Sequence, residues 1–198
     1  RACPDRTGAP RTRLLARRGW TPPPGALDLG RVDRARARAP DVRVLRGGAG
    51  KDTLIGGTGD DGYEVDEPGD VIQESSNGGF DSVNALYDFV LPANFEGLSL
   101  SGAATSGTGN AANNLMSANS IASKIAGLDG DDTLIGSGSD DTLMGGAGDD
   151  SYDVRSGASQ IVELAGEGVD TILVDYTYTL GDNLENLTVH GNSLVLTG

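Results

Sequence analysis

The sequence predicts an all-β fold, a parallel β-solenoid preceded by a disordered N-terminal segment, from three observations. A nine-residue pattern of glycines, one aspartate and one apolar residue occurs five times. Residues 56–102 match residues 145–191 at a constant offset of 89, which indicates a tandem duplication. Glycine supplies 31 of 198 residues and aromatic residues only 5%. Short repeats of this composition bury their apolar residues against neighbouring copies, as thin stacked coils do.

Residues 1–46 are expected to be disordered, except that their last coil is a candidate cap. Twelve of the fifteen basic residues lie here against four acidic ones, among prolines and without apolar periodicity. Residues 38–46 can form the cap, with Leu45 pointing inward. An arginine-rich tail raises the alternative of binding to nucleic acid or an anionic surface. A solvated linker, or sequence foreign to the native protein, explains it better, and we expect no nucleic-acid partner.

Each nonapeptide combines a turn, a carboxylate and a core residue. Glycines at positions one, two and four permit a tight turn with its carbonyl groups on one side. Position six is always aspartate, and position eight is Leu or Tyr on a short strand, facing the core. The copies span residues 47–55, 56–64, 127–135, 136–144 and 145–153; their aspartates are Asp52, Asp61, Asp132, Asp141 and Asp150, and their core residues are Leu54, Tyr63, Leu134, Leu143 and Tyr152.

Successive units alternate between two edges of the coil, so turns 18 residues apart stack at roughly one strand spacing, about 4.8 Å. Asp132 and Asp150 are one such step apart. Facing carboxylates at about 5 Å repel by on the order of 3 kcal/mol at an effective dielectric near 20. Calcium prefers carboxylate and carbonyl oxygens and reverses that sign. We therefore predict calcium between the turns, coupled to folding, with residues 127–132 and 145–150 as the best pair.

Strand patterns continue after the nonapeptides in both copies of the duplication. In the second copy Ile172, Val174, Tyr176, Tyr178 and Leu180 alternate with mostly polar residues, which predicts one apolar face. A further strand is expected at the end of each copy. These strands contain Leu98 with Leu100, and Leu187 with Val189.

Residues 103–126 are small and polar and permit two interpretations. The nonapeptide register continues through residues 109–117 and 118–126, with Asn114 and Ser123 in place of aspartate. We expect coils without strong metal ligands here. The alternative is a flexible linker rich in Ala, Ser and Asn.

The pattern GGxGxDxUx resembles the RTX, or haemolysin-type, calcium-binding repeat, whose family folds as a parallel β-roll. The resemblance implies that the first six residues of each unit supply carbonyl and carboxylate ligands and the next three form the strand. Leu128 replaces a glycine in one copy, and Ser137 and Ser139 shift the glycines in another. Asp70, 18 residues after Asp52, is a candidate partner across the edge of the first coil. The implied metal ligands are Gly47, Gly48, Gly50, Asp52, Gly56, Gly57, Gly59, Asp61, Asp70, Gly127, Gly130, Asp132, Gly136, Gly138, Asp141, Gly145, Gly146, Gly148 and Asp150.

The resemblance also implies a secreted, extracellular protein exported by type I secretion machinery. Cys3 is the single cysteine, so calcium rather than disulfides is expected to staple the fold. No stretch approaches 18 apolar residues, so no transmembrane segment is expected.

Catalysis is not expected within this segment. His190 is the single histidine, which leaves zinc motifs and Ser-His-Asp triads without a second or central residue, and no GxSxG elbow occurs. The leading hypothesis is a calcium-triggered folding and stability module. The alternatives are a C-terminal module of a secreted protease, lipase or polysaccharide-modifying enzyme, and a repeat-built surface adhesin. Contact with a cell surface or a polysaccharide stays open.

Overall fold

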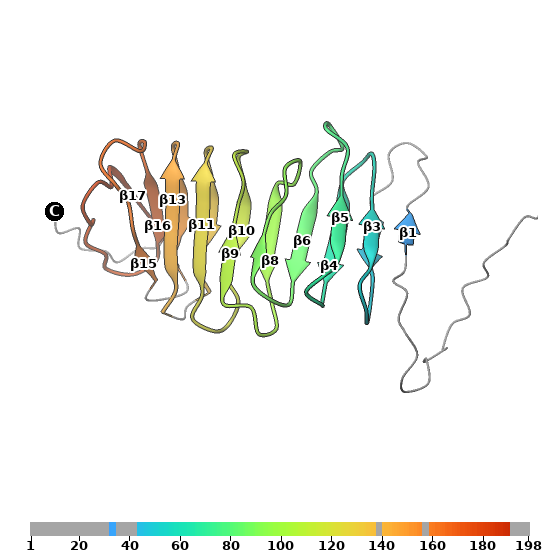
Figure 1. The fold of residues 1–198 in the computed structure, drawn as a ribbon. Coiled ribbons are helices and arrows are strands. Elements are labelled where there is room, and N and C mark those ends of the chain that lie inside the picture. The colour runs from blue at the N-terminus through green and yellow to red at the C-terminus, as the bar shows by residue number, and fades with distance from the viewer. Residues whose placement is uncertain (1–31, 35–42, 138–139, 156–158, 191–198) are drawn as a thin grey trace, which may run out of the picture.

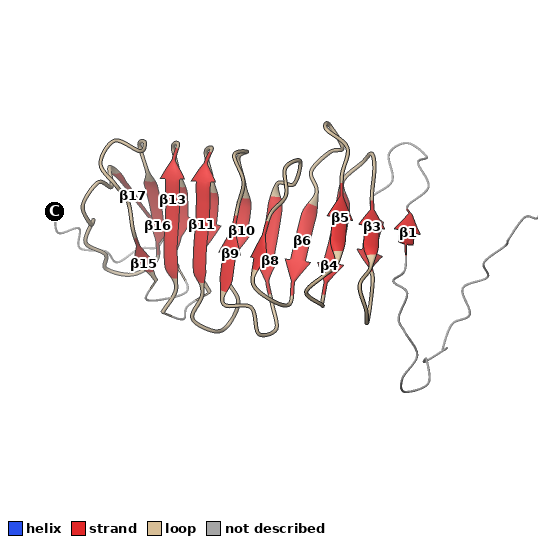
Figure 2. Ribbon diagram, in the orientation of Figure 1, coloured by secondary structure: helices blue, strands red, loops and turns tan. Residues whose placement is uncertain are grey.

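The chain forms a parallel β-solenoid in which the strands lie side by side as rungs from β1 to β17 (Figure 1). The computed structural model describes residues 32–34, 43–137, 140–155 and 159–190. Within these ranges every regular element is a strand (Figure 2). Accordingly, no helix long and apolar enough to cross a membrane is found among them. The predicted fold class is confirmed.

One wall of the coil is a nine-stranded sheet made by the even-numbered strands and β17. All its neighbours pair in parallel, as a solenoid requires, because each coil brings the chain back in the same direction. Its strands are β2 (Arg43–Arg46), β4 (Asp61–Val65), β6 (Ser82–Ala85), β8 (Gly97–Leu100), β10 (Leu115–Ser117), β12 (Thr133–Ile135), β14 (Ser151–Asp153), β16 (Thr171–Val174) and β17 (Asn186–Val189).

The opposite wall consists of the odd-numbered strands in two separate parallel sheets. One sheet has the order β1-β3-β5 and the other β15-β13-β11-β9-β7, so the wall is interrupted between β5 and β7. The strands are β1 (Val32–Arg34), β3 (Thr53–Ile55), β5 (Val71–Gln73), β7 (Phe89–Val90), β9 (Ser106–Thr108), β11 (Lys124–Asp129), β13 (Thr142–Ala147) and β15 (Gln160–Ile161).

The coil lengths explain the 89-residue duplication. Tyr63 pairs with Val83 and Val83 with Leu98, steps of 20 and 15 residues. The next three steps, through Met116 and Leu134 to Tyr152, are 18 residues each. These five coils make up one period of 89, and the second copy repeats the 20-residue and 15-residue steps. The duplication is therefore a unit of five whole coils.

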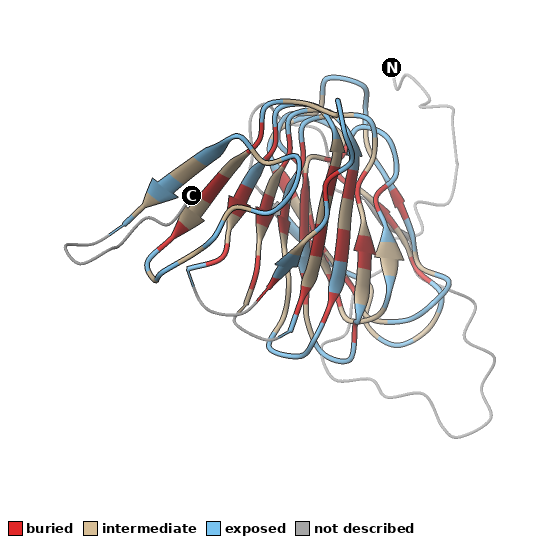
Figure 3. Cartoon of the chain, turned by 90° about the vertical axis from the view of Figure 1, so that its left-hand side faces the viewer, coloured by how far each residue is buried: buried red, intermediate tan, exposed pale blue. Residues whose placement is uncertain are grey.

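The core is a stack of inward-pointing apolar side chains, about one from each strand, between the two walls (Figure 3). All five residues at position eight of the nonapeptides are at most 2% exposed, as predicted. Phe95, in the 15-residue coil, packs edge-to-face on Tyr63 with ring centroids 5.2 Å apart. The core is thin, so neighbouring coils supply most of each residue's burial.

The structure shows where several segments singled out in the sequence lie. Residues 103–126 contain β9, β10 and the start of β11, so they are coils of the solenoid and not a linker. Leu45 is buried in β2, pointing inward as expected. The strand expected through Leu180 ends at Val174, although the later apolar residues still pack on the core. β1 was not anticipated; most of residues 1–46 lie outside the described ranges.

Candidate metal centre

The turns that join the two walls gather carboxylates along both long edges of the solenoid. We call the turns that precede even-numbered strands the first edge and those that precede odd-numbered strands the second edge. Asp61, Asp132 and Asp150 lie on the first edge, and Asp52 and Asp141 on the second. All five are buried, at 1 to 3% exposure. Burying ionised groups so completely is unfavourable unless a partner compensates their charge.

At Asp132 and Asp150 on the first edge, a backbone N–H fixes one carboxylate oxygen and the other oxygen has no donor. The backbone N–H of Asp132 donates to Oδ1 of Asp150 at 2.7 Å, and that of Asp150 donates to Oδ1 of Asp170 at 2.9 Å. The Oδ2 atoms of Asp132 and Asp150 are buried and have no hydrogen-bond partner. An ionised carboxylate only accepts, so a cation is the natural partner for these oxygens.

Backbone carbonyl groups complete an oxygen-rich space between the stacked turns. A Cβ at Gly127 would lie 2.7 Å from the carbonyl oxygen of Gly145, and one at Gly146 would overlap that of Leu128. Gly146 also has a φ of 106°, which L-residues rarely adopt. Glycine is thus required twice, by the close approach of the turns and by their backbone conformation. Hard carboxylate and carbonyl oxygens together are the donor set that calcium prefers.

Leu128 adopts the turn conformation despite its side chain, with a φ of 93°. The glycine lost at this position therefore leaves the turn in place but strains it. The glycines in the five predicted turns that have positive φ are Gly48, Gly50, Gly57, Gly59, Gly130, Gly146 and Gly148.

The pKa values of Asp132 and Asp150 indicate that no nearby positive charge compensates these carboxylates. Burial, reinforced by the charge of Asp150, raises the pKa of Asp132 to about 7. Burial, with the nearby charge of Asp170, raises the pKa of Asp150 to about 6. A raised pKa means that the charged form is disfavoured in the metal-free fold. A bound divalent cation would remove that penalty.

Turns that lack aspartate close themselves with their own donors. The Nδ2 group of Asn114 donates to the carbonyl oxygen of Phe95 and to Oδ1 of Asn110, both at 3.3 Å. The hydroxyl of Ser123 donates to the carbonyl oxygen of Ile121 at 2.9 Å. In these turns neutral side-chain donors bind the oxygen atoms, so no buried charge needs a cation. This agrees with the expectation of coils without strong ligands.

Asp141 differs from Asp132 and Asp150 because both of its oxygens accept hydrogen bonds. Oδ1 accepts from the N–H of Ser123 at 2.8 Å, and Oδ2 accepts from the N–H of Ser137 at 2.9 Å and from its hydroxyl. Ser137 stands where three of the other copies have the second glycine. In the same turn Gly136 is buried, and Gly138 lies outside the described residues. Of the five aspartates, Asp141 is thus the least suited to a metal.

The first pair of nonapeptides stacks on acidic residues that follow it. The N–H of Asp52 donates to Oδ1 of Asp70 at 3.0 Å, so these two residues stack on the second edge. The N–H of Asp61 donates to Oδ1 of Asp81 at 2.8 Å, across a 20-residue coil. A Cβ at Gly47 would lie 2.6 Å from Oδ2 of Asp52, so this glycine too makes room for the carboxylate.

Four acidic residues of the site were missed by the sequence analysis. Two clusters have ligand atoms that all lie within 4.8 Å of one another. The duplication already aligned the missed residues at offset 89, and the 18-residue step from Gly127 through Gly145 reaches Glu163, so the signal was present. The clusters are Asp61 with Glu74 and Asp81, and Asp150 with Glu163 and Asp170.

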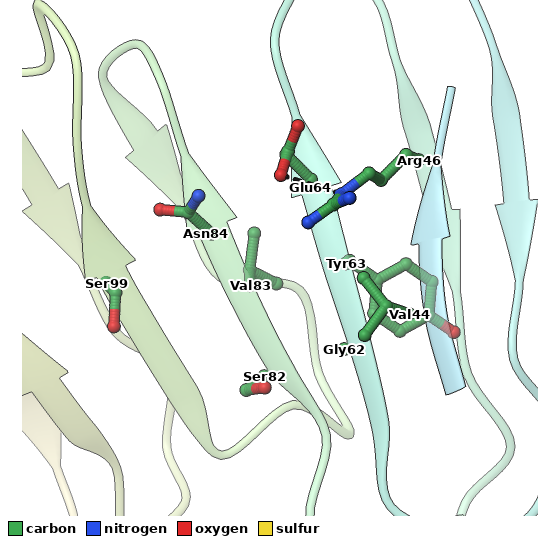
Figure 4. Close-up of a pocket in the computed structure, with 9 residues that line it drawn as sticks. All are labelled: Val44, Arg46, Gly62, Tyr63, Glu64, Ser82, Val83, Asn84 and Ser99. Carbon is green, nitrogen blue, oxygen red and sulfur yellow. Dashed lines mark hydrogen bonds and ion pairs between the residues drawn. The ribbon is translucent and has the colours of Figure 1, made fainter. Parts of the chain in front are cut away.

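The outer face of the nine-stranded sheet carries a shallow depression of about 190 Å³. Its floor is made by β4 and β6, and Arg46 reaches across from β2 to Glu64 on β4 (Figure 4). The two side chains form an ion pair at 2.9 Å. The rest of the lining is Val44, Gly62, Tyr63, Ser82, Val83, Asn84 and Ser99, so the single carboxylate in this depression is the one already paired with Arg46.

Comparison with known proteins agrees with the geometry. A family model for the RTX calcium-binding nonapeptide repeat matches residues 44–63 and 124–161 in four copies. The chain is also 37% identical over 65 residues to Endo-1,3-1,4-beta-glycanase EglC of Rhizobium meliloti (strain 1021), a match that covers 33% of this chain and 14% of that protein. No solved structure matches. The four matched repeats and the parallel β-solenoid together fit an RTX calcium-binding repeat protein with a β-roll fold.

Proposed function

We propose that this β-roll is a calcium-triggered folding and stability module of a secreted protein. The observation that carries the proposal is the stack of Asp132 and Asp150, whose buried Oδ2 atoms lack partners while their pKa values are raised. Without calcium the folded state holds these charges unfavourably. With calcium the same atoms become ligands, so binding free energy becomes folding free energy.

Secretion through a type I channel fits this behaviour. A chain that folds only with calcium stays extended where calcium is scarce and folds where it is abundant. Affinities of about 10⁻⁴ to 10⁻³ M are those of extracellular calcium modules. The proposed ligands are the aspartates of the nonapeptides with carbonyl groups of their glycine turns, foremost those of residues 127–132 and 145–150.

The test is a calcium titration of the chain followed by far-ultraviolet circular dichroism. We expect a cooperative gain of β-sheet signal that chelator reverses. The variant Asp132→Asn with Asp150→Asn should abolish that gain, because amides are weaker ligands and remove two charges. Asp131→Asn with Asp149→Asn is the matched control: it removes the same charge from the same turns at exposed positions. An unchanged transition in the first variant rejects this pair as ligands.

A second candidate is an accessory module of a polysaccharide-acting enzyme. The similarity to a glycanase over 65 residues favours it. Under this proposal the catalytic domain lies elsewhere in a longer protein, and the β-roll stabilises it. Sequencing the complete gene tests it: a glycoside hydrolase domain supports the proposal, whereas repeats that only continue the 89-residue period contradict it and favour an adhesin.

A further inference from the structure

On the first edge, a glutamate follows the last nonapeptide turn of each array at the register position of a glycine. The first residues of the stacked turns on the first edge are Gly127 and Gly145, and the next 18-residue step reaches Glu163. In the first array the same step leads from Gly56 to Glu74. Each glutamate lies in the 20-residue coil that ends its array. At the C-terminal end of both arrays, the first glycine of the turn is thus replaced by a residue that adds a side-chain carboxylate.

The glutamate points back into the last turn of its array. Ligand atoms of Asp150, Glu163 and Asp170 lie within 4.8 Å of one another, and all three residues are buried. Glu163 is 8% exposed and Asp150 1%. Oε2 of Glu163 and Oδ2 of Asp150 have no hydrogen-bond partner. Three carboxylates converge here, where the stack of Asp132 on Asp150 offers two.

The first array builds the same cluster, which argues against coincidence. Asp61, Glu74 and Asp81 also have ligand atoms within 4.8 Å of one another. Oδ2 of Asp81 is buried without a hydrogen-bond partner. The two clusters are separated by one duplication period, so the arrangement belongs to the five-coil unit.

A tyrosine holds each glutamate in place. The hydroxyl of Tyr152 hydrogen-bonds Oε1 of Glu163 and accepts from the N–H of Gly145 at 2.6 Å. The hydroxyl of Tyr63 hydrogen-bonds Glu74 in the same way. The other three nonapeptides have leucine at this position. Tyrosine therefore occurs only in the units whose turn faces a glutamate, and it fixes one oxygen of that glutamate. Oε2 of Glu163 is left for a ligand, whereas Oε2 of Glu74 also accepts from the N–H of Gly57 at 2.9 Å.

We propose that each array ends in a three-carboxylate calcium site, made by Asp150, Glu163 and Asp170 in one copy and by Asp61, Glu74 and Asp81 in the other. The inference rests on the proposed function and adds an order to it. Calcium affinity rises with the number of charged ligands. The two end sites bind calcium more tightly than the sites between nonapeptide turns, and they fill first.

The test is equilibrium dialysis of the whole chain against calcium, with circular dichroism on the same samples. In the double variant Glu74→Gln with Glu163→Gln, the dissociation constants of the two most tightly bound calcium ions per chain should rise by about tenfold or more. Glu167→Gln is the matched control, because it removes one charge from the same coil outside the cluster. We expect its titration to overlay that of the unmodified chain.

Two results separate the failure of this inference from that of the proposed function. If the unmodified chain neither binds calcium nor gains β-sheet signal, both are overturned. If it does both, and the double glutamine variant binds the same number of calcium ions with the same affinities, only the end sites are overturned.

A second variant covers the case in which glutamine prevents folding. Glu163→Gly restores the glycine that the regular turns carry at this register position, and it should fold in excess calcium while losing the tight site. Tyr152→Phe tests the positioning residue. It keeps every carboxylate, and we expect weaker calcium binding at this site by about tenfold with the β-sheet content at saturating calcium unchanged. Unaltered affinity in both variants contradicts the proposal.

Discussion

At the scale of the residue, the difference between a calcium turn and a metal-free turn is the supply of donors. Asn114 and Asp132 occupy equivalent positions in stacked coils, and the N–H of Asn114 donates to Oδ1 of Asp132 at 2.7 Å. Asn114 also donates through its own amide, which ties its turn to Phe95. Asp132 has no proton to give when ionised. The same fold therefore runs through both turns, but only the second leaves a buried carboxylate oxygen without a donor.

The raised pKa values predict how the metal-free chain responds to pH. The pKa of Asp132 is raised to about 7 and that of Glu163 to about 8, chiefly by burial. In the unfolded chain these groups titrate near 4, so between about pH 4 and 8 the folded state binds more protons. The free energy of unfolding without calcium should fall as pH rises through this window. Circular dichroism in metal-free buffer should show more β-sheet at pH 5 than at pH 7.5; the reverse order would contradict it.

The strained turn residue offers a stabilising substitution. Leu128 has a φ of 93° and is 47% exposed, so its side chain gains little from packing. Leu128→Gly should relieve about 1 to 2 kcal/mol of backbone strain. The greater freedom of glycine in the unfolded chain offsets about 0.5 to 1 kcal/mol of that gain. We expect a higher urea midpoint at saturating calcium; Leu115→Gly, in a strand with negative φ, should lower it.

At the scale of the element, the sequence predicts what each coil repeats and misses how coils vary. The nonapeptide motif indicates the turn, the candidate ligand and the core residue of each coil. It therefore predicts Asp132 and Asp150 as candidate ligands and the position-eight residues as core. The ends of the arrays carry no such signature. Glu163 replaces a glycine, and the coil lengthens to 20 residues to accommodate it, so the local pattern breaks there. Only the stacking of whole coils brings Glu163 and Asp170 together. Similarly, β1 pairs with β3 through backbone contacts that the pattern of residues 1–46 does not reveal.

The metal-free coils between the arrays should transmit stability from one array to the other. Met116 in β10 is fully buried, and Met116→Ala should destabilise its coil by about 2 to 5 kcal/mol. In a stack stabilised by neighbour contacts, one weak coil uncouples its two sides. The single calcium transition should therefore split into two in circular dichroism. Leu115→Ala, its exposed neighbour, should leave one transition; a single transition in both variants would show that the arrays fold independently of these coils.

At the scale of the whole molecule, charge alone does not explain the need for calcium. Residues 47–198 carry 25 acidic and three basic residues, a balance of −22. General repulsion of this kind is screened by any salt, with a Debye length of about 8 Å at 0.15 M. The five aspartates at position six of the nonapeptides are buried, and screening reaches them poorly. We therefore expect the ion to enter the turns and to exchange its hydration water for carbonyl and carboxylate oxygens of the protein.

The choice of ion separates these two contributions. Magnesium demands a small octahedral shell at about 2.0 to 2.1 Å and keeps several waters, whereas calcium accepts six to eight protein oxygens at longer distances. We expect calcium to compact the chain, and neither magnesium nor sodium at equal ionic strength to do so. Small-angle scattering measures the result: without calcium the radius of gyration should approach the roughly 48 Å of an unfolded chain of this length. Equal compaction by magnesium would contradict this prediction. It would mean that the positive charge of the ion is sufficient and that coordination geometry does not select calcium.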